Sequence, residues 1–87
     1  MKTIKETKYL KFIAEERKGR KTKIIHIYNR SAVEEIATIE WYPVWRQYVF
    51  IASFMFDAVW NNTCLKDILE VLETLAKERQ IEKPKGE

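Results

Sequence analysis

Residues 64–76 read CLKDILEVLETLA, and the spacing of their apolar side chains largely determines how the rest of the chain must fold. These side chains recur at i, i+3, i+4 and i+7, which places them along one side of an α-helix. They are Leu65, Ile68, Leu69, Leu72, Leu75 and Ala76. Asn61, Asn62 and Thr63 precede the stretch, and all three residue types are preferred at helix N-caps. We therefore expect one amphipathic helix over residues 63–80.

The sequence before residue 54 has a period of two, which is typical of β-strands. Ala37, Ile39 and Trp41, for example, fall on one face of such a strand, and the residues between them are polar. Turn-forming residues separate four stretches of this kind, with Gly19 in the first turn and Pro43 before the last strand. We therefore expect four strands, at residues 9–15, 22–28, 34–41 and 46–52.

These elements predict an α+β fold: an antiparallel β-meander of about four strands, covered on one face by a single C-terminal amphipathic helix. A sheet with one apolar face must bury that face against another element, and this helix is the element that can do so. Short loops favour the meander over more complex strand orders. The 87 residues make a single domain, 1–87, with a meander over 8–53, an aromatic connector over 54–62, a helix over 63–80 and a frayed tail over 81–87. Residues 54–60 fit either an edge strand or a loop.

The residue counts leave few catalytic or cofactor-binding arrangements. One Cys excludes an internal disulfide, one His argues against a histidine metal cage, and two Gly leave no glycine-rich phosphate loop. Cys64 and His26 would make a nucleophilic dyad, but Cys64 borders the apolar stripe, where a free cysteine is usually a small buried hydrophobe. His26 fits a hydrogen-bonded sheet residue better than an acid–base group. We therefore expect no enzyme activity, no catalytic residues, no metal site and no cofactor.

The sequence carries no targeting signal for a membrane or for secretion. Its first residues lack the apolar core of a secretory signal, and no stretch approaches the roughly 20 apolar residues that cross a bilayer. The unpaired Cys64 fits a reducing compartment. These features predict a cytoplasmic protein that makes no contact with membranes.

Basic residues are concentrated in the first quarter of the chain. The whole sequence has 16 Lys and Arg against 13 Asp and Glu, but residues 1–23 hold nine basic and three acidic side chains. Such a segment can contact phosphates or an acidic partner. The alternative prediction of function is therefore nucleic-acid binding by the basic N-terminal hairpin, through Lys8, Lys11, Arg17, Lys18, Arg20, Lys21 and Lys23. The plainer interpretation is a solvated hairpin whose lysines protect an edge strand from aggregation.

Aromatic residues are concentrated between residues 41 and 60. Eight of the eleven aromatic side chains lie there, which is more than one helix can cover in a small core. Because neighbours on a strand face opposite sides, Trp41 and Tyr42 cannot both point inward. We therefore predict an exposed aromatic and cationic surface that binds a ligand or partner through Tyr42, Trp45, Arg46 and Trp60. The alternative is that Trp45 folds back over the sheet edge with Arg46 stacked on it.

Two blocks of the sequence resemble small uncharacterised proteins of bacteriophages and prophages. The first contains Trp41-Tyr42 and Trp45-Arg46-Gln47-Tyr48-Val49-Phe50, and the second is Cys64-Leu65-Lys66-Asp67-Ile68. The resemblance extends over residues 9–76. It implies an origin in a phage or mobile element and no particular mechanism.

Together these observations predict a small non-enzymatic binding protein of phage or mobile-element origin. Its aromatic and arginine surface would act on a host protein, on a small ligand or on a second copy of the chain, which would make a homodimer or larger homo-oligomer. By analogy with other small phage proteins, such binding suggests a role in host takeover or counter-defence.

Overall fold

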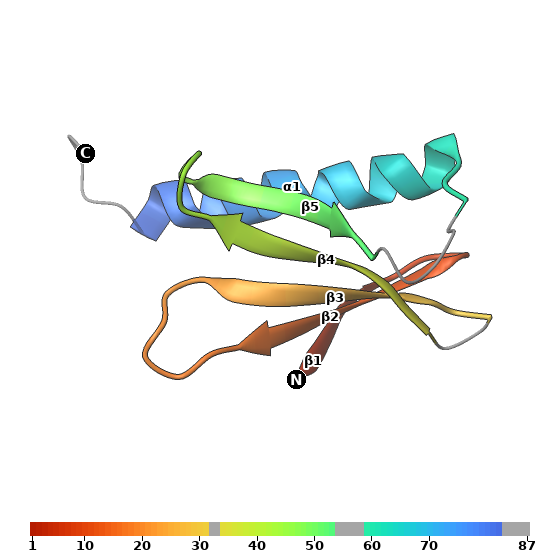
Figure 1. Ribbon diagram of the computed structural model, residues 1–87, viewed down its shortest axis with the longest axis horizontal. Helices are drawn as coiled ribbons and strands as arrows, with labels where there is room; N and C mark the ends of the chain where they lie inside the picture. The colour runs from red at the N-terminus through yellow and green to blue at the C-terminus, as the bar shows by residue number, and fades with distance from the viewer. Residues whose placement is uncertain (32–33, 54–58, 83–87) are drawn as a thin grey trace.

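The computed structural model describes residues 1–31, 34–53 and 59–82, which form one sheet and one helix (Figure 1). Five strands lie side by side in sequence order, each antiparallel to its neighbours: β1 (Lys2–Glu6), β2 (Leu10–Glu16), β3 (Lys23–Asn29), β4 (Glu34–Tyr42) and β5 (Gln47–Ala52). The helix α1 (Asn62–Glu82) runs along one face of this sheet. The predicted α+β fold, an antiparallel meander followed by one covering helix, is confirmed.

Strand β1 is not predicted from the sequence. It pairs with β2, with Lys2 opposite Ala14. Its five residues, KTIKE, include one apolar side chain, so they lack the alternation that marks a half-buried strand. Pairing with β2 and an ion pair with the helix hold it in place, since Lys5 Nζ lies 2.5 Å from Glu70 Oε1. A short charged strand at the edge also disfavours pairing with another chain.

The other strands and the helix begin and end within one or two residues of the predicted positions. Asn61 is the N-cap of α1, because its Oδ1 accepts a hydrogen bond from the backbone N–H of Cys64 at 2.8 Å. Residues 81 and 82, expected in the frayed tail, belong to the helix. Residues 54–58 and 83–87 lie outside the described part of the chain. The prediction of either an edge strand or a loop over residues 54–60 falls mostly on these residues.

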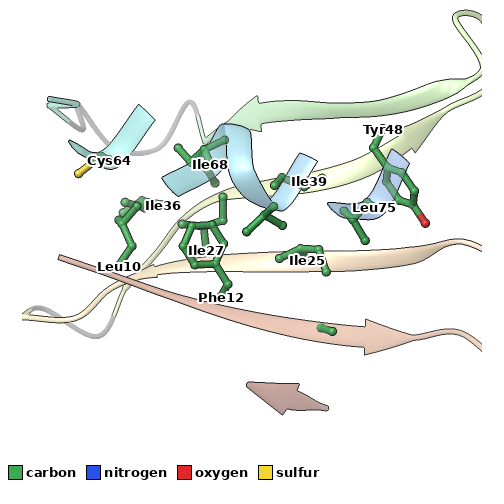
Figure 2. Packing of buried hydrophobic residues seen from close by; sticks show 13 residues of the cluster. Leu10, Phe12, Ile25, Ile27, Ile36, Ile39, Tyr48, Cys64, Ile68 and Leu75 are labelled. Atoms are coloured by element: carbon green, nitrogen blue, oxygen red, sulfur yellow. The ribbon is translucent and has the colours of Figure 1, made fainter. Parts of the chain in front are cut away.

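The core lies between α1 and the inner face of the sheet (Figure 2). The largest fully buried side chains come from the three central strands, and they are Phe12, Ile25, Ile27 and Ile39. The helix contributes Cys64, Ile68, Val71 and Leu75. Burying an apolar side chain of this size stabilises a fold by about 1.5–3 kcal/mol relative to leaving it exposed. This contact therefore fixes the position of α1 on the sheet.

The helix buries Ile68 and Leu75 as predicted, but for the rest of its buried side it uses a neighbouring edge instead of the predicted one. Leu65 and Leu69, expected in the buried stripe, are 50% and 53% exposed, whereas Cys64 and Val71 are buried. The edge with Leu65 and Leu69 lies beside the edge with Cys64 and Val71 on the helix surface. Both edges have apolar residues at helical spacing, so periodicity alone does not predict which one faces the sheet. Packing against the sheet determines which edge is buried, because only one narrow side of α1 contacts the inner face.

We expect Leu75→Ala to lower the free energy of unfolding by about 2–4 kcal/mol, because it leaves a cavity in the core. Leu69→Ala removes the same atoms from an exposed position of the same helix and should change stability by about 0.5 kcal/mol or less. Urea denaturation of both variants, followed by circular dichroism, measures the difference. Equal losses would mean that Leu69 is buried as the periodicity first suggests.

Candidate functional site

The hairpin between β4 and β5 ends in an exposed turn over residues 43–46. Tyr42 and Gln47 are the last paired residues of the two strands. The backbone N–H of Arg46 donates to the Pro43 carbonyl at 3.2 Å, and Arg46 has φ 54°, in the left-handed region. Four residues of this hairpin end, which we call the aromatic tip, are Tyr42, Val44, Trp45 and Arg46.

The apolar side chains of the aromatic tip lie outside the core. Val44 is 74% exposed, Trp45 63% and Tyr42 38%. The rings of Tyr42 and Trp45 meet edge to face, with centroids 5.0 Å apart and planes at 81°. Among the described residues, Trp45 makes this ring contact and no cation–π contact with Arg46. The two rings therefore support each other at the surface, and each keeps area for a further contact.

A second aromatic pair fixes the base of the aromatic tip. Trp41 and the buried Tyr48 pack edge to face with centroids 5.4 Å apart. The guanidinium of Arg79, on α1, lies 4.9 Å from the centroid of the Trp41 ring. The Tyr48 hydroxyl accepts a hydrogen bond at 3.3 Å from the backbone N–H of Lys23, at the start of β3. The base of the tip is thus connected both to the helix and, across β4, to β3.

Trp60, predicted to act with these residues, lies elsewhere. It precedes α1 and packs edge to face against Phe50, with centroids 5.3 Å apart, at the margin of the core. The start of α1 and the turn between β4 and β5 lie at opposite ends of the sheet (Figure 1). Of the four residues predicted to bind a partner, Tyr42, Trp45 and Arg46 therefore share one surface, and Trp60 does not.

The loop between β2 and β3 carries four of the seven cations predicted to bind nucleic acid. It surrounds an open hollow of about 710 Å³. The backbone N–H of Arg20 donates to the Arg17 carbonyl at 3.1 Å, and Gly19 between them has φ 78°, which suits the third position of a type II turn. Four cations of this turn, which we call the basic loop, are Arg17, Lys18, Arg20 and Lys21.

The other three predicted cations are placed differently. Lys8 lies in the hairpin between β1 and β2, where its ammonium is 5.4 Å from the centroid of the Tyr9 ring, and Lys11 follows near the start of β2. This end of the sheet is opposite the basic loop (Figure 1). Lys23 forms an ion pair with Glu78 of α1 at 3.3 Å. The seven cations therefore do not form one patch, and the basic loop is the part that concentrates charge.

His26 forms a cluster with two glutamates on the outer face of the sheet, and this cluster is not predicted from the sequence. Its Nε2 lies 2.6 Å from Glu15 Oε1 on β2, and its Nδ1 is hydrogen-bonded to Glu35 Oε1 on β4. A register shift after Ile27 places Glu35 opposite Tyr28 and so beside His26. The alternation of side chains along β2 and β3 already predicts that Glu15 and His26 lie on the same face. Predicting their contact also requires the register between the two strands.

Both ring nitrogens of His26 face carboxylates, an arrangement that favours the doubly protonated, cationic ring. Burial alone lowers the pKa of His26. The hydrogen bonds to Glu15 and Glu35, together with the charges of these carboxylates, outweigh burial and raise the pKa above its usual 6.5. The cluster is therefore an ion-paired network at the centre of the uncovered face.

Cys64 and His26 do not come together. Cys64 is buried in the core beneath the helix, and His26 lies on the opposite face of the sheet. Within residues 1–31, 34–53 and 59–82, no group of three or more His, Cys, Asp or Glu could hold a metal ion. No helix in this part of the chain is both long and apolar enough to span a bilayer.

The chain has a distant homologue among phage proteins. It is 29% identical over 77 residues to an uncharacterised 9.3 kDa protein of Acholeplasma phage L2, and the match covers 88% of this chain and 96% of that protein. The predicted resemblance to small phage proteins is confirmed. No protein-family model matches the chain. No solved structure is significantly similar to it.

The His26 cluster makes stability depend on pH. Because the pKa of His26 is raised in the folded state, its stabilising effect is complete below the unfolded value of about 6.5 and disappears as pH rises through the folded value. We expect the protein to be less stable at pH 8.5 than at pH 5.5 in urea denaturation, and His26→Gln to remove this part of the difference. An NMR titration that places the pKa of His26 below 6.5 would contradict the assignment.

The left-handed backbone of Arg46 is strained, and glycine relieves the strain. We expect Arg46→Gly to raise the free energy of unfolding by about 0.5–1 kcal/mol, after allowing for the greater freedom of glycine in the unfolded chain. Arg46→Ala removes the same side chain and keeps the strain, so it should bring no such gain. Thermal and urea denaturation of the two variants provide the test, and equal stability of both would argue against strain at this position.

Proposed function

We propose that this chain is a non-enzymatic binding protein that contacts its partner through the aromatic tip. The observation that supports this proposal best is the exposure of Trp45, which is 63% accessible at the end of a hairpin whose base is fixed. A large indole at such a position adds little to the stability of its own fold. It is well placed to be buried by something else.

The residue types of the aromatic tip favour recognition. Trp, Tyr and Arg are the side chains most enriched among interface residues that dominate binding energy. The edge-to-face contact with Tyr42 orients the Trp45 ring before any partner arrives. Because Trp41, Tyr48 and Arg79 hold the base of the tip, binding requires little ordering of the chain, which reduces its entropic cost.

The positions of Cys64 and His26 support a role without catalysis. A nucleophilic thiol needs a nearby base and access to substrate, but Cys64 is buried and separated from His26 by the sheet. Both nitrogens of His26 are engaged by Glu15 and Glu35. Neither residue is arranged to move a proton to or from a bound molecule.

The homologue in Acholeplasma phage L2 suggests the setting in which such a protein acts. A phage product that binds without catalysis works by occupying its partner, and the benefit to the phage arises when that partner is a host component. We therefore propose a role in host takeover or counter-defence.

A photo-crosslinker at the aromatic tip tests this function. We expect p-benzoylphenylalanine in place of Val44 to give a discrete adduct in Acholeplasma lysate, since that side chain is 74% exposed beside Trp45. Excess unlabelled protein should suppress the adduct, and excess Trp45→Ala should not. The readout is the labelled adduct on a denaturing gel, and an adduct of twice the chain mass would identify a second copy as the partner.

The matched control carries the same crosslinker in place of Leu69, another exposed apolar side chain on the helix. It should give no adduct that depends on Trp45. If excess Trp45→Ala suppresses the Val44 adduct as well as the unchanged protein does, the aromatic tip is not the contact surface.

A further inference from the structure

The aromatic tip and the basic loop project from the same end of the sheet. In a meander, alternate hairpins point the same way, so the β2–β3 loop and the β4–β5 turn emerge together (Figure 1). From the sequence alone, these two sets of residues are alternative candidates for the binding site. The fold places both sets at the same end of the sheet.

The two hairpins are joined at their base. The ladder between β3 and β4 ends at the pair Ile25 and Ile39, and beyond it the hairpins part. There the Lys23 backbone N–H is bonded to the Tyr48 hydroxyl, at the start of β5. The axes of the two hairpins are separated by two strand spacings, about 10 Å at the base.

The charge at this end favours an anion. Within the described part of the chain, no ion pair involves Arg17, Lys18, Arg20 or Lys21. Glu16 is the single carboxylate lining the hollow of the basic loop. Nε of Arg17 is buried and has no hydrogen-bond partner among the described residues. The basic loop therefore offers cations that the fold itself does not neutralise.

We propose that the basic loop and the aromatic tip form one surface for single-stranded nucleic acid. Phosphates lie against the basic loop, and a base stacks on Trp45. This inference rests on the proposed function and names its partner. An acidic peptide would satisfy the cations alone, whereas a nucleotide chain supplies both phosphates and flat aromatic faces. A duplex is disfavoured because its bases are stacked on one another and leave no free face for Trp45.

Fluorescence anisotropy with a labelled (dT)12 probe tests this assignment. We expect binding at 50 mM salt that is about 20- to 50-fold weaker at 200 mM, which corresponds to three or four phosphate contacts on a single strand. Trp45→Ala should weaken binding by about 5- to 150-fold, the range measured for loss of one base stack, and should leave the salt dependence unchanged.

The triple variant Lys18→Gln, Arg20→Gln, Lys21→Gln should flatten the log–log salt dependence by about 2. Its matched control, Lys8→Gln, Lys11→Gln, Lys66→Gln, has the same net charge but changes residues away from this end of the sheet. The control should keep the salt dependence of the unchanged protein. Circular dichroism of both triples verifies that each is folded.

Several results would overturn the inference. They are absence of binding at 50 mM salt, equal loss in the two triple variants, an unchanged affinity in Trp45→Ala, and equal or tighter binding of duplex DNA or polyglutamate. If (dT)12 does not bind while the Val44 adduct persists after nuclease treatment, the aromatic tip binds a protein and only this inference fails. If the tip-dependent adduct is absent as well, the proposed function fails with it.

Discussion

One narrow apolar contact holds this fold together, and it covers only part of the sheet. Ile68, Val71 and Leu75 of α1 pack on the side chains of the central strands. The sheet is about 19 Å wide across five strands. A helix with its side chains is about 10 Å wide. A single helix therefore leaves the outer face and the hairpin ends uncovered, and the exposed rings of Tyr42 and Trp45 lie at one of these ends.

The same core explains why the exposed hairpin is held rigidly. Tyr48 is buried at the margin of the core, where its ring supports Trp41 and its hydroxyl binds the backbone of Lys23. This side chain completes the hydrogen bonding of β3 beyond the point where the β3–β4 ladder ends. Tyr48 therefore both stabilises the fold and supports the hairpin that exposes Trp45.

Sequence patterns predicted the elements with strong periodicity and missed what depends on packing. Strand β1 escaped prediction because KTIKE has no alternation, and pairing with β2 alone makes it a strand. The buried helix edge was partly wrong because Leu65 and Leu69 lie beside an equally apolar edge. For the site, a short separation in sequence led to a wrong grouping. Trp60 is close to Trp45 along the chain, but it comes just before α1, which starts at the other end of the sheet.

The outer face of the sheet is the other surface that a partner could cover, and its chemistry argues against that role. Apolar side chains lie on it, such as the 47% exposed Ile51. At its centre, however, Glu15, His26 and Glu35 form a network of two carboxylates around one imidazole ring. Covering it with an apolar surface, including the same face of a second copy, would remove water from both carboxylates, and one imidazole ring can compensate the charge of at most one of them. Covering the basic loop and the aromatic tip has no such desolvation cost, because an anionic partner would replace the water around the cations with charge of the opposite sign.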